Sequence, residues 1–104
     1  MFIEYEKDFL KELYEEGTCK NEKSRFDAAV IKKYQKRMDT LMAATRMEDL
    51  FVFHSLNFEA LPGRSHCFSI RIDSHYRLEF KVRREGNGPV VTIYVLTDRT
   101  NPYQ

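Results

Sequence analysis

The sequence predicts a single α+β domain in which two helices cover one face of a small, mainly antiparallel sheet. In the first half of the chain, apolar residues recur at three- and four-residue spacing, which is typical of amphipathic helices. In much of the second half they alternate with polar residues, as in strands with one buried and one wet face. The predicted order is β-α-α-β-β-β, and residues 1–104 are expected to form one domain.

The first elements are a short strand and a helix. Residues 2–5 are of types that favour strands. A helical pattern follows from Glu6, whose charge suits a helix N-terminus, and Gly17 is a natural stop signal. The apolar stripe of this helix consists of Phe9, Leu10, Leu13 and Tyr14.

A second, longer helix is expected after a polar loop at residues 18–24. Asn21 or Ser24 is expected to cap its start, and its end is expected near residues 45–47. Lysine and arginine residues occupy most of the opposite face, as solvated charges do. The apolar stripe of this helix contains Phe26, Val30, Tyr34, Met38, Leu41 and Met42.

Three strands are predicted after an irregular or extended segment at residues 47–63, which ends in a Pro-Gly turn signal. Residues 66–73 and 76–82 alternate in polarity, and the short reversal between them predicts antiparallel pairing. After a hairpin loop at residues 85–88, the strand at residues 89–97 is apolar on both faces. We therefore expect that last strand to be central or covered on both sides.

Composition excludes several classes of protein. Four glycines, three prolines and two cysteines do not fit collagen-like, low-complexity or disulfide-scaffold chains, and the 13% aromatic content indicates a buried core. No apolar run approaches the roughly 20 residues that span a bilayer, and the acidic N-terminal segment is unlike a secretory signal. We expect a cytoplasmic protein with no membrane partner, in which Cys19 and Cys67 are free thiols.

The sequence predicts neither a cofactor nor a metal. It contains no Gly-rich phosphate loop, no nucleophile elbow and no acidic metal cluster. The three histidines, His54, His66 and His75, lack the spacing of paired metal ligands.

Charge is unevenly distributed along the chain, although the net charge is only +1. Residues 1–22 contain seven acidic and three basic side chains, whereas residues 64–84 contain six basic and two acidic ones. This distribution suits a protein with one anion-binding surface, and it is equally consistent with two ordinary solvated faces.

The predicted wet face of the sheet has the residue types of an RNA-binding surface. Arginine binds phosphate through two parallel hydrogen bonds, and aromatic rings stack on unpaired bases. No recognition helix for duplex DNA is evident. The face carries Arg71, Arg77, Lys81 and Arg83, is bordered by Arg64 and His66, and is approached by Tyr94, Asp98, Arg99 and Tyr103 from the last strand and tail.

Residues 56–80 resemble the RelE/HigB-like toxins of type II toxin–antitoxin modules. The shared pattern is a turn, a first arginine-bearing strand, a reversal and a second such strand. Three segments match it in order and spacing: Leu61-Pro62-Gly63, Ser69-Ile70-Arg71-Ile72 and Tyr76-Arg77-Leu78-Glu79-Phe80. The N-terminal segment and residues 41–50 also resemble the HigB branch.

The resemblance implies the RelE/HigB-like toxin fold and a messenger-RNA endoribonuclease that acts on the translating ribosome without metal. In that reaction a ribose 2′-hydroxyl attacks the adjacent phosphate, which requires a base, cations and an acid. The resemblance also implies an antitoxin partner, of the HigA-like helix-turn-helix type.

Carried over to this chain, the resemblance assigns Arg77 as the transition-state and phosphate clamp, with Arg64 near the scissile phosphate. In the C-terminal tail, Tyr103 is expected to orient or deprotonate the nucleophile, and Arg99 to join the phosphate contacts. The expected catalytic set is Arg77, Arg64, Tyr103, Arg99 and His66, and the expected RNA-binding set is Arg71, Lys81, Arg83, Arg84 and Asp98.

Two departures from the family pattern leave alternatives open. Pro102 stands where relatives have a tail histidine, and Pro62 replaces the lysine of the turn. His66 is either a substitute base or an exposed residue at the start of a strand. Arg71 either contacts RNA or pairs with Asp73 or Glu79, and Arg83 and Arg84 either contact RNA or are solvated. The alternative function is a weakened toxin fold that acts as a binding module for antitoxin or ribosome.

Overall fold

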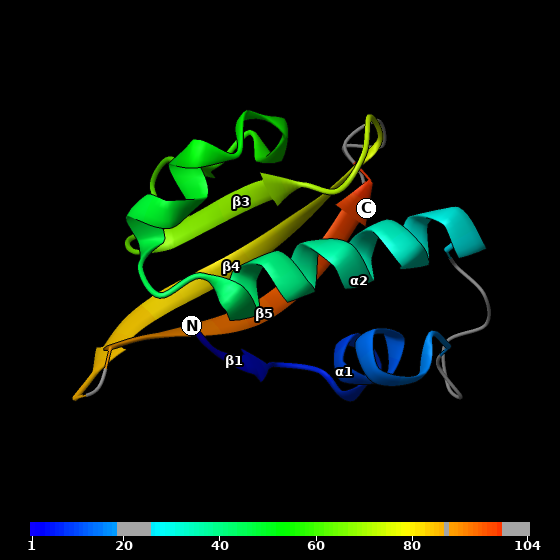
Figure 1. Ribbon diagram of the computed structural model, residues 1–104, viewed down its shortest axis with the longest axis horizontal. Helices are drawn as coiled ribbons and strands as arrows, with labels where there is room; N and C mark the ends of the chain where they lie inside the picture. Colours follow the sequence, from blue (N-terminus) through cyan, green and yellow to red (C-terminus); the bar gives the residue numbers. More distant parts are fainter. Residues whose placement is uncertain (19–25, 87, 99–104) are drawn as a thin grey trace.

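The computed structural model describes residues 1–18, 26–86 and 88–98, and it confirms the predicted α+β class (Figure 1). The elements are β1 (Phe2–Tyr5), α1 (Asp8–Glu16), α2 (Ala28–Ala43), the 3-10 helices η1 (Met47–Val52) and η2 (His54–Leu56), β2 (Glu59–Ala60), β3 (Cys67–Arg71), β4 (Tyr76–Glu85) and β5 (Gly88–Asp98).

The strands form one sheet in the order β1-β5-β4-β3-β2. Only the edge strand β1 runs parallel to its neighbour, whereas the other pairs among the described strands are antiparallel. As predicted, β5 is an inner strand of the sheet, with β1 along one of its edges and β4 along the other. The short edge strand β2 lies within the segment that was expected to be irregular or extended.

The first helix agrees closely with its prediction. It begins at Asp8, two residues later than expected, and ends at Glu16. Gly17 follows with φ 72°, a left-handed conformation that glycine adopts without steric cost, and its N–H bonds to the carbonyl of Leu13. Leu10 and Leu13 bury the inner face of the helix.

The second helix is shorter than predicted at both ends. Phe26 precedes the helix instead of lying on it, and Asp27 is the N-cap residue, without a side-chain capping bond. The expected caps, Asn21 and Ser24, lie outside the described residues. The helix ends at Ala43 because the following residue already has an extended backbone.

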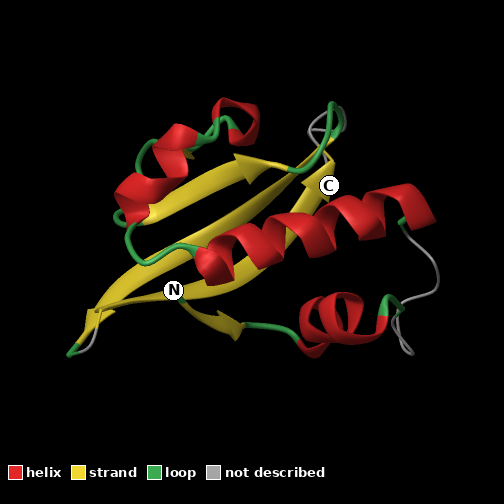
Figure 2. Ribbon diagram, viewed as in Figure 1, coloured by secondary structure: helices red, strands yellow, loops and turns green. Residues whose placement is uncertain are grey.

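Both helices pack on the same face of the sheet and share one core with it (Figures 1 and 2). Tyr34 of α2 is fully buried, and its hydroxyl donates a hydrogen bond of 2.7 Å to the carbonyl of Leu10 in α1. The largest apolar side chains below 2% exposure are Phe80, Leu10, Met38, Leu41, Leu50, Leu56, Ile70, Ile72, Leu78, Ile93 and Val91.

The segment after α2 is more ordered than predicted. It forms η1 and η2, which cover the core near β3. Phe58, just before β2, stacks on Phe68 of β3 with ring centroids 5.2 Å apart, and Phe51 of η1 meets Phe58 edge-on at 4.9 Å. These aromatic contacts hold the short helices against the sheet.

A β-bulge interrupts the alternation of β5. Ile93 pairs with Phe80 and Val95 with Glu79, so that Tyr94 is the extra residue. Both Ile93 and Leu96 are buried, although they are three positions apart. The bulge therefore explains why this strand reads as apolar on both faces.

Candidate functional site

The face of β3 and β4 opposite the helices carries most of the predicted site residues. By strand alternation this face, hereafter the open face, bears Cys67, Ser69, Arg71, Arg77, Glu79 and Lys81. Contrary to the expectation of a uniformly wet surface, its centre is buried. Ser69 is 1% exposed and Glu79 is 5% exposed, and the two residues are paired in register between the strands.

Two arginines meet at the buried carboxylate of Glu79. Oε1 lies 3.2 Å from Nη1 of Arg64, and Oε2 lies 3.1 Å from Nη2 of Arg77. The side chain of Arg64 is 55% exposed and that of Arg77 is 32% exposed. The carboxylate therefore bridges two guanidinium groups whose outer surfaces still reach solvent.

Tyr94 completes this cluster from the bulge of β5. Its hydroxyl lies 3.1 Å from Nη1 of Arg64, the same nitrogen that contacts Glu79. Burial and, after it, the adjacent Cys67 thiol raise the pKa of Tyr94 to about 12, while Arg64 acts in the opposite direction. The phenol is therefore protonated at neutral pH. We call Arg64, Arg77, Glu79 and Tyr94 the arginine cluster.

Turns on either side of β3 place the two arginines. Arg64 follows a turn in which Gly63 has φ 73°, and its backbone N–H bonds to the carbonyl of Leu61. At the other end, the carboxylate of Asp73 accepts hydrogen bonds of 2.8 Å from the backbone N–H groups of both His75 and Tyr76. This closed reversal holds the start of β4 and with it Arg77. Backbone bonds at the reversal also lower the pKa of Asp73, although burial opposes them.

Arg77 retains unused hydrogen-bonding capacity. Its Nε is buried and has no hydrogen-bond partner within the described residues. A buried donor without a partner is costly, and the described residues provide none for this nitrogen.

Arg71 and Lys81 lie on the open face outside the cluster. Arg71 pairs in register with Arg77 and is exposed. Its Nε donates to the backbone carbonyl of Asp73 at 3.1 Å, so neither of the carboxylate pairings considered for it is formed. Lys81 is exposed beside Cys67, in agreement with a solvent-facing cation.

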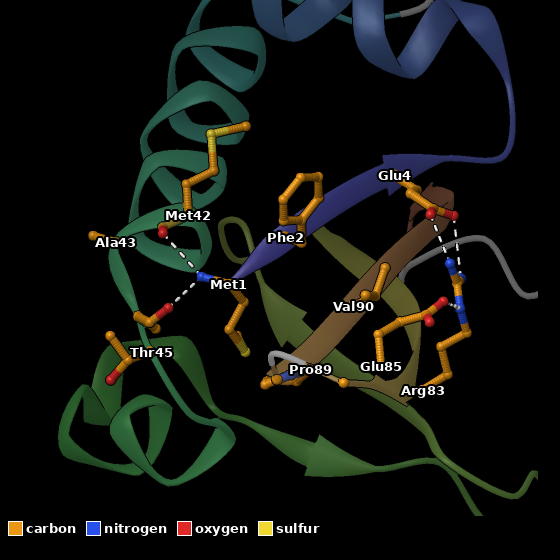
Figure 3. Close-up of a pocket in the computed structure, with 13 residues that line it drawn as sticks. Met1, Phe2, Glu4, Met42, Ala43, Thr45, Arg83, Glu85, Pro89 and Val90 are labelled. Carbon is orange, nitrogen blue, oxygen red and sulfur yellow. Dashed lines mark hydrogen bonds and ion pairs between the residues drawn. The ribbon is translucent and has the colours of Figure 1, made fainter.

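Arg83 and Arg84 do not join the cluster. Arg83 holds the carboxylate of Glu4 with two nitrogens, at 2.7 and 3.1 Å, and that of Glu85 at 2.9 Å (Figure 3). Arg83 therefore has a local role that was not predicted, which is to tie β1 to β4, and its contact with RNA stays a prediction. Arg84 is exposed on the face of Val82, away from the open face.

The histidines are peripheral in the structure. His66 is exposed with φ 60°, and its carbonyl accepts a bond of 2.9 Å from the N–H of Val82. His75 is an exposed residue of the reversal. Neither imidazole has a hydrogen bond to the four cluster residues.

The predicted tail residues cannot be placed. Arg99 and Tyr103 lie outside the described residues, and so does the side chain of Asp98. The backbone of Asp98 pairs with Tyr76, the residue before Arg77. The last described residue of β5 therefore lies beside the first residue of β4, next to Arg77.

Sequence reasoning did not identify Glu79 as a site residue. A glutamate at an alternating strand position is normally read as solvated, and no local pattern distinguishes it. The only available signal was its position two residues after Arg77, on the same face of the predicted strand and inside the family motif.

Other parts of the described chain show no competing site for a metal or a membrane. No group of three potential metal ligands occurs among residues 1–18, 26–86 and 88–98. No helix in the same ranges is long and apolar enough to cross a membrane. Cys67 is a free, buried thiol, while Cys19 lies outside the described residues.

A groove with a volume of about 660 Å³ lies at another part of the molecule (Figure 3). It lies between the C-terminal end of α2, β1 and the β4–β5 hairpin. None of the four cluster residues lines it. Phe2, Met42, Thr45, Glu85 and Val90 are among its lining residues.

Comparisons with known proteins agree with the fold and with the motif. Residues 3–98 match the family described as the RelE-like toxin of type II toxin-antitoxin system HigB. Among solved structures, the chain is similar to a YoeB/ParE toxin from Agrobacterium tumefaciens, with a TM-score of 0.55 and 14% identity, over 95% of this chain and 99% of that one. No curated protein matches the chain significantly in sequence.

Proposed function

This chain belongs to the RelE-like HigB toxin family of type II toxin–antitoxin systems, and on that premise we propose that it is a metal-independent endoribonuclease that cleaves messenger RNA on the ribosome. The observation that carries the proposal is the meeting of Arg64 and Arg77 on the open face. They come from separate segments, and each presents a partly exposed guanidinium beside one buried carboxylate.

The proposed reaction is an internal transfer at one phosphodiester. The ribose 2′-oxygen forms a bond to the neighbouring phosphorus as its proton passes to a base, and the bond to the 5′-oxygen breaks as that oxygen receives a proton. The products are a 2′,3′-cyclic phosphate and a 5′-hydroxyl. Charge builds up on the phosphate oxygens in the transition state, where preorganised cations stabilise it most.

We assign that stabilisation to Arg77 and Arg64. Arginine remains charged at any working pH and can contact two phosphate oxygens through its planar fork. The partly exposed side chain of Arg77, at the buried carboxylate of Glu79, supports its assignment as the first phosphate contact. Arg71 and Lys81 extend the positive surface for the adjoining nucleotides.

Tyr94 is assigned a supporting role, because a phenol with a pKa of about 12 does not accept a proton near neutral pH. Proton transfer is assigned to the tail, with Tyr103 as the first candidate and Arg99 as a further phosphate contact. His66 is the second candidate for the base.

The decisive test uses the wild-type protein and the variant Arg77→Ala in a cleavage assay with translating ribosomes and end-mapped message. We expect the variant to cleave at least about 100-fold more slowly, because it loses one preorganised donor to the transition-state anion. Arg37→Ala on α2, which removes the same charge from the opposite layer, serves as the control and should cleave normally. Full cleavage by Arg77→Ala would contradict the proposal.

Family membership implies an antitoxin, and we propose a small HigA-like helix-turn-helix protein as that partner. Co-expression of the product of an adjacent reading frame tests this. We expect a complex that survives gel filtration and abolishes cleavage. Arg77→Ala should form the same complex, because its lesion is in catalysis.

The second candidate function is a binding module that has lost much of its activity. Pro62 and Pro102 favour it, since they replace a cation and a proton-transfer group of the family pattern. If the wild-type chain leaves growth and message intact when expressed alone, while Pro102→His arrests growth, the binding-module function is the correct one.

A further inference from the structure

We propose that Glu79 is a positioning residue, whose buried carboxylate holds the guanidinium groups of Arg64 and Arg77 side by side as a phosphate clamp. This inference rests on the proposed function and assigns a role to a residue that the family motif does not mark.

The burial of Glu79 requires an explanation. A carboxylate is rarely buried unless it is paired, because removal from water is strongly unfavourable for the charged form. Glu79 is 5% exposed on a face that also contains solvent-exposed cations. Both of its oxygens are engaged, each with a different arginine.

The geometry suits positioning. Two guanidinium groups repel each other when they are close, and a shared anion between them removes that repulsion. The described residues contact Arg64 only through Nη1 and Arg77 only through Nη2. The side chains of Arg64 and Arg77 are still partly exposed, so the exposed donors of both groups are available to a ligand while the bridge stays in place.

The surroundings restrict the bridge further. Ser69 pairs with Glu79 on one side and is 1% exposed, and Val95 pairs with it on the other. Tyr94 contacts the same nitrogen of Arg64 that Glu79 contacts. A carboxylate fixed between two strands provides a rigid reference point, as catalytic geometry requires.

The opposite role for Glu79 is inhibitory: its negative charge weakens RNA binding, and its removal accelerates cleavage. The two roles predict opposite changes in the cleavage rate. Both predict RNA binding at least as tight as in the wild type once the charge is removed.

The test compares wild type with Glu79→Gln, which keeps the shape and one acceptor oxygen but removes the charge. Glu79→Met, of similar length, serves if the glutamine variant does not fold. Glu85→Gln is the matched control, because it removes one carboxylate from the same strand and from another arginine. Two kinds of measurement are made. The functional one gives the single-turnover cleavage rate on ribosome-bound message and the affinity for RNA, and the structural one is NMR of the arginine side-chain N–H groups.

We expect Glu79→Gln to cleave about 10- to 100-fold more slowly while its dissociation constant for RNA stays the same or decreases. The Nε–H signals of Arg64 and Arg77 should be resolved in wild type and exchange-broadened in the variant. Glu85→Gln should match wild type in both respects.

An unchanged or increased cleavage rate in Glu79→Gln overturns the proposal, and so do unchanged arginine signals. Failure of the wild-type protein to cleave any message refutes the proposed function instead. In that event the NMR comparison still shows whether Glu79 fixes the two arginines.

Discussion

Tyr94 illustrates how one additional residue changes what a side chain can contact. Without the bulge, strict alternation would continue through β5 and the sequence positions of Ile93 and Leu96 would lie on opposite faces. With the bulge, both pack into the core and the hydroxyl of Tyr94 reaches Arg64. Bulges near functional sites commonly redirect a side chain in this way.

The raised pKa of Tyr94 leads to a titration prediction. The phenol ionises near pH 10 in the unfolded chain and near pH 12 in the folded one, so the stability associated with neutral Tyr94 is lost as pH rises between these values. We expect the absorbance difference between wild type and Tyr94→Phe at phenolate wavelengths to appear only above about pH 11. A difference already present near pH 9 would show that the tyrosine is not buried as described.

The sequence could not predict how deeply the individual residues of the arginine cluster are buried. Alternation correctly assigns Arg77 and Glu79 to the same face of one strand. It carries no information about how far Arg64, Tyr94 and Ser69 cover that face, because these residues come from a turn and two other strands. The buried centre of the cluster is therefore a tertiary property.

At the scale of elements, the start of η1 depends on one carboxylate. Asp49 accepts hydrogen bonds from the backbone N–H groups of Thr45 and Arg46, at 3.0 and 3.2 Å, and from the hydroxyl of Thr45 at 3.0 Å. The backbone bonds, first that from Thr45, lower the pKa of Asp49 below its ordinary value. This carboxylate fixes the direction in which the chain leaves α2.

We therefore expect Asp49→Asn to reduce the free energy of unfolding at pH 7. Because the folded pKa is depressed, the stabilisation is present above the unfolded value and is lost as pH falls below about 4. Urea titrations of both proteins should thus differ at pH 7, and the difference should shrink as pH falls below about 4. A difference that does not shrink below that pH would mean that the ionised form is not responsible.

The elements differ in how well the sequence predicts them. β3 and β4 were predicted because their alternation continues over several residues and a reversal separates them. η1 and η2 were not, since 3-10 turns are too short to establish a period. Phe51 of η1 packs on Phe58, and Phe58 in turn contacts Phe68 of β3 and Phe80 of β4.

At the scale of the whole molecule, the fold gathers basic side chains from separate segments on one face of the sheet. The open face gathers Arg64, Arg71, Arg77 and Lys81 around one internal carboxylate. Arg83, in contrast, is neutralised by Glu4 and Glu85 at another site. Basic residues that are close in sequence therefore make unequal contributions to any anion-binding surface.

This arrangement predicts a moderate salt dependence of RNA binding. With up to four cations at the interface, the logarithm of affinity should fall with the logarithm of salt concentration with a slope of about −3 or shallower. Fluorescence anisotropy with a 2′-O-methyl RNA, which cannot be cleaved, measures this slope. A slope steeper than about −4 would require phosphate contacts beyond the open face.

The family motif identifies Arg64 and Arg77 as candidate site residues, and in the structure both contact Glu79. Arg83 is not part of the arginine cluster, because the parallel pairing of β1 with β5 places Glu4 beside that arginine. A pairing between the two ends of a chain leaves no local pattern, so this exception was not predictable.

That same pairing has a consequence for synthesis. Phe2 emerges from the ribosome long before its backbone partner Val90 is added. The nascent chain therefore cannot complete its sheet until β5 has been translated, and β5 must enter between two strands made earlier. Formation of the native sheet is consequently delayed until β5 has left the ribosome.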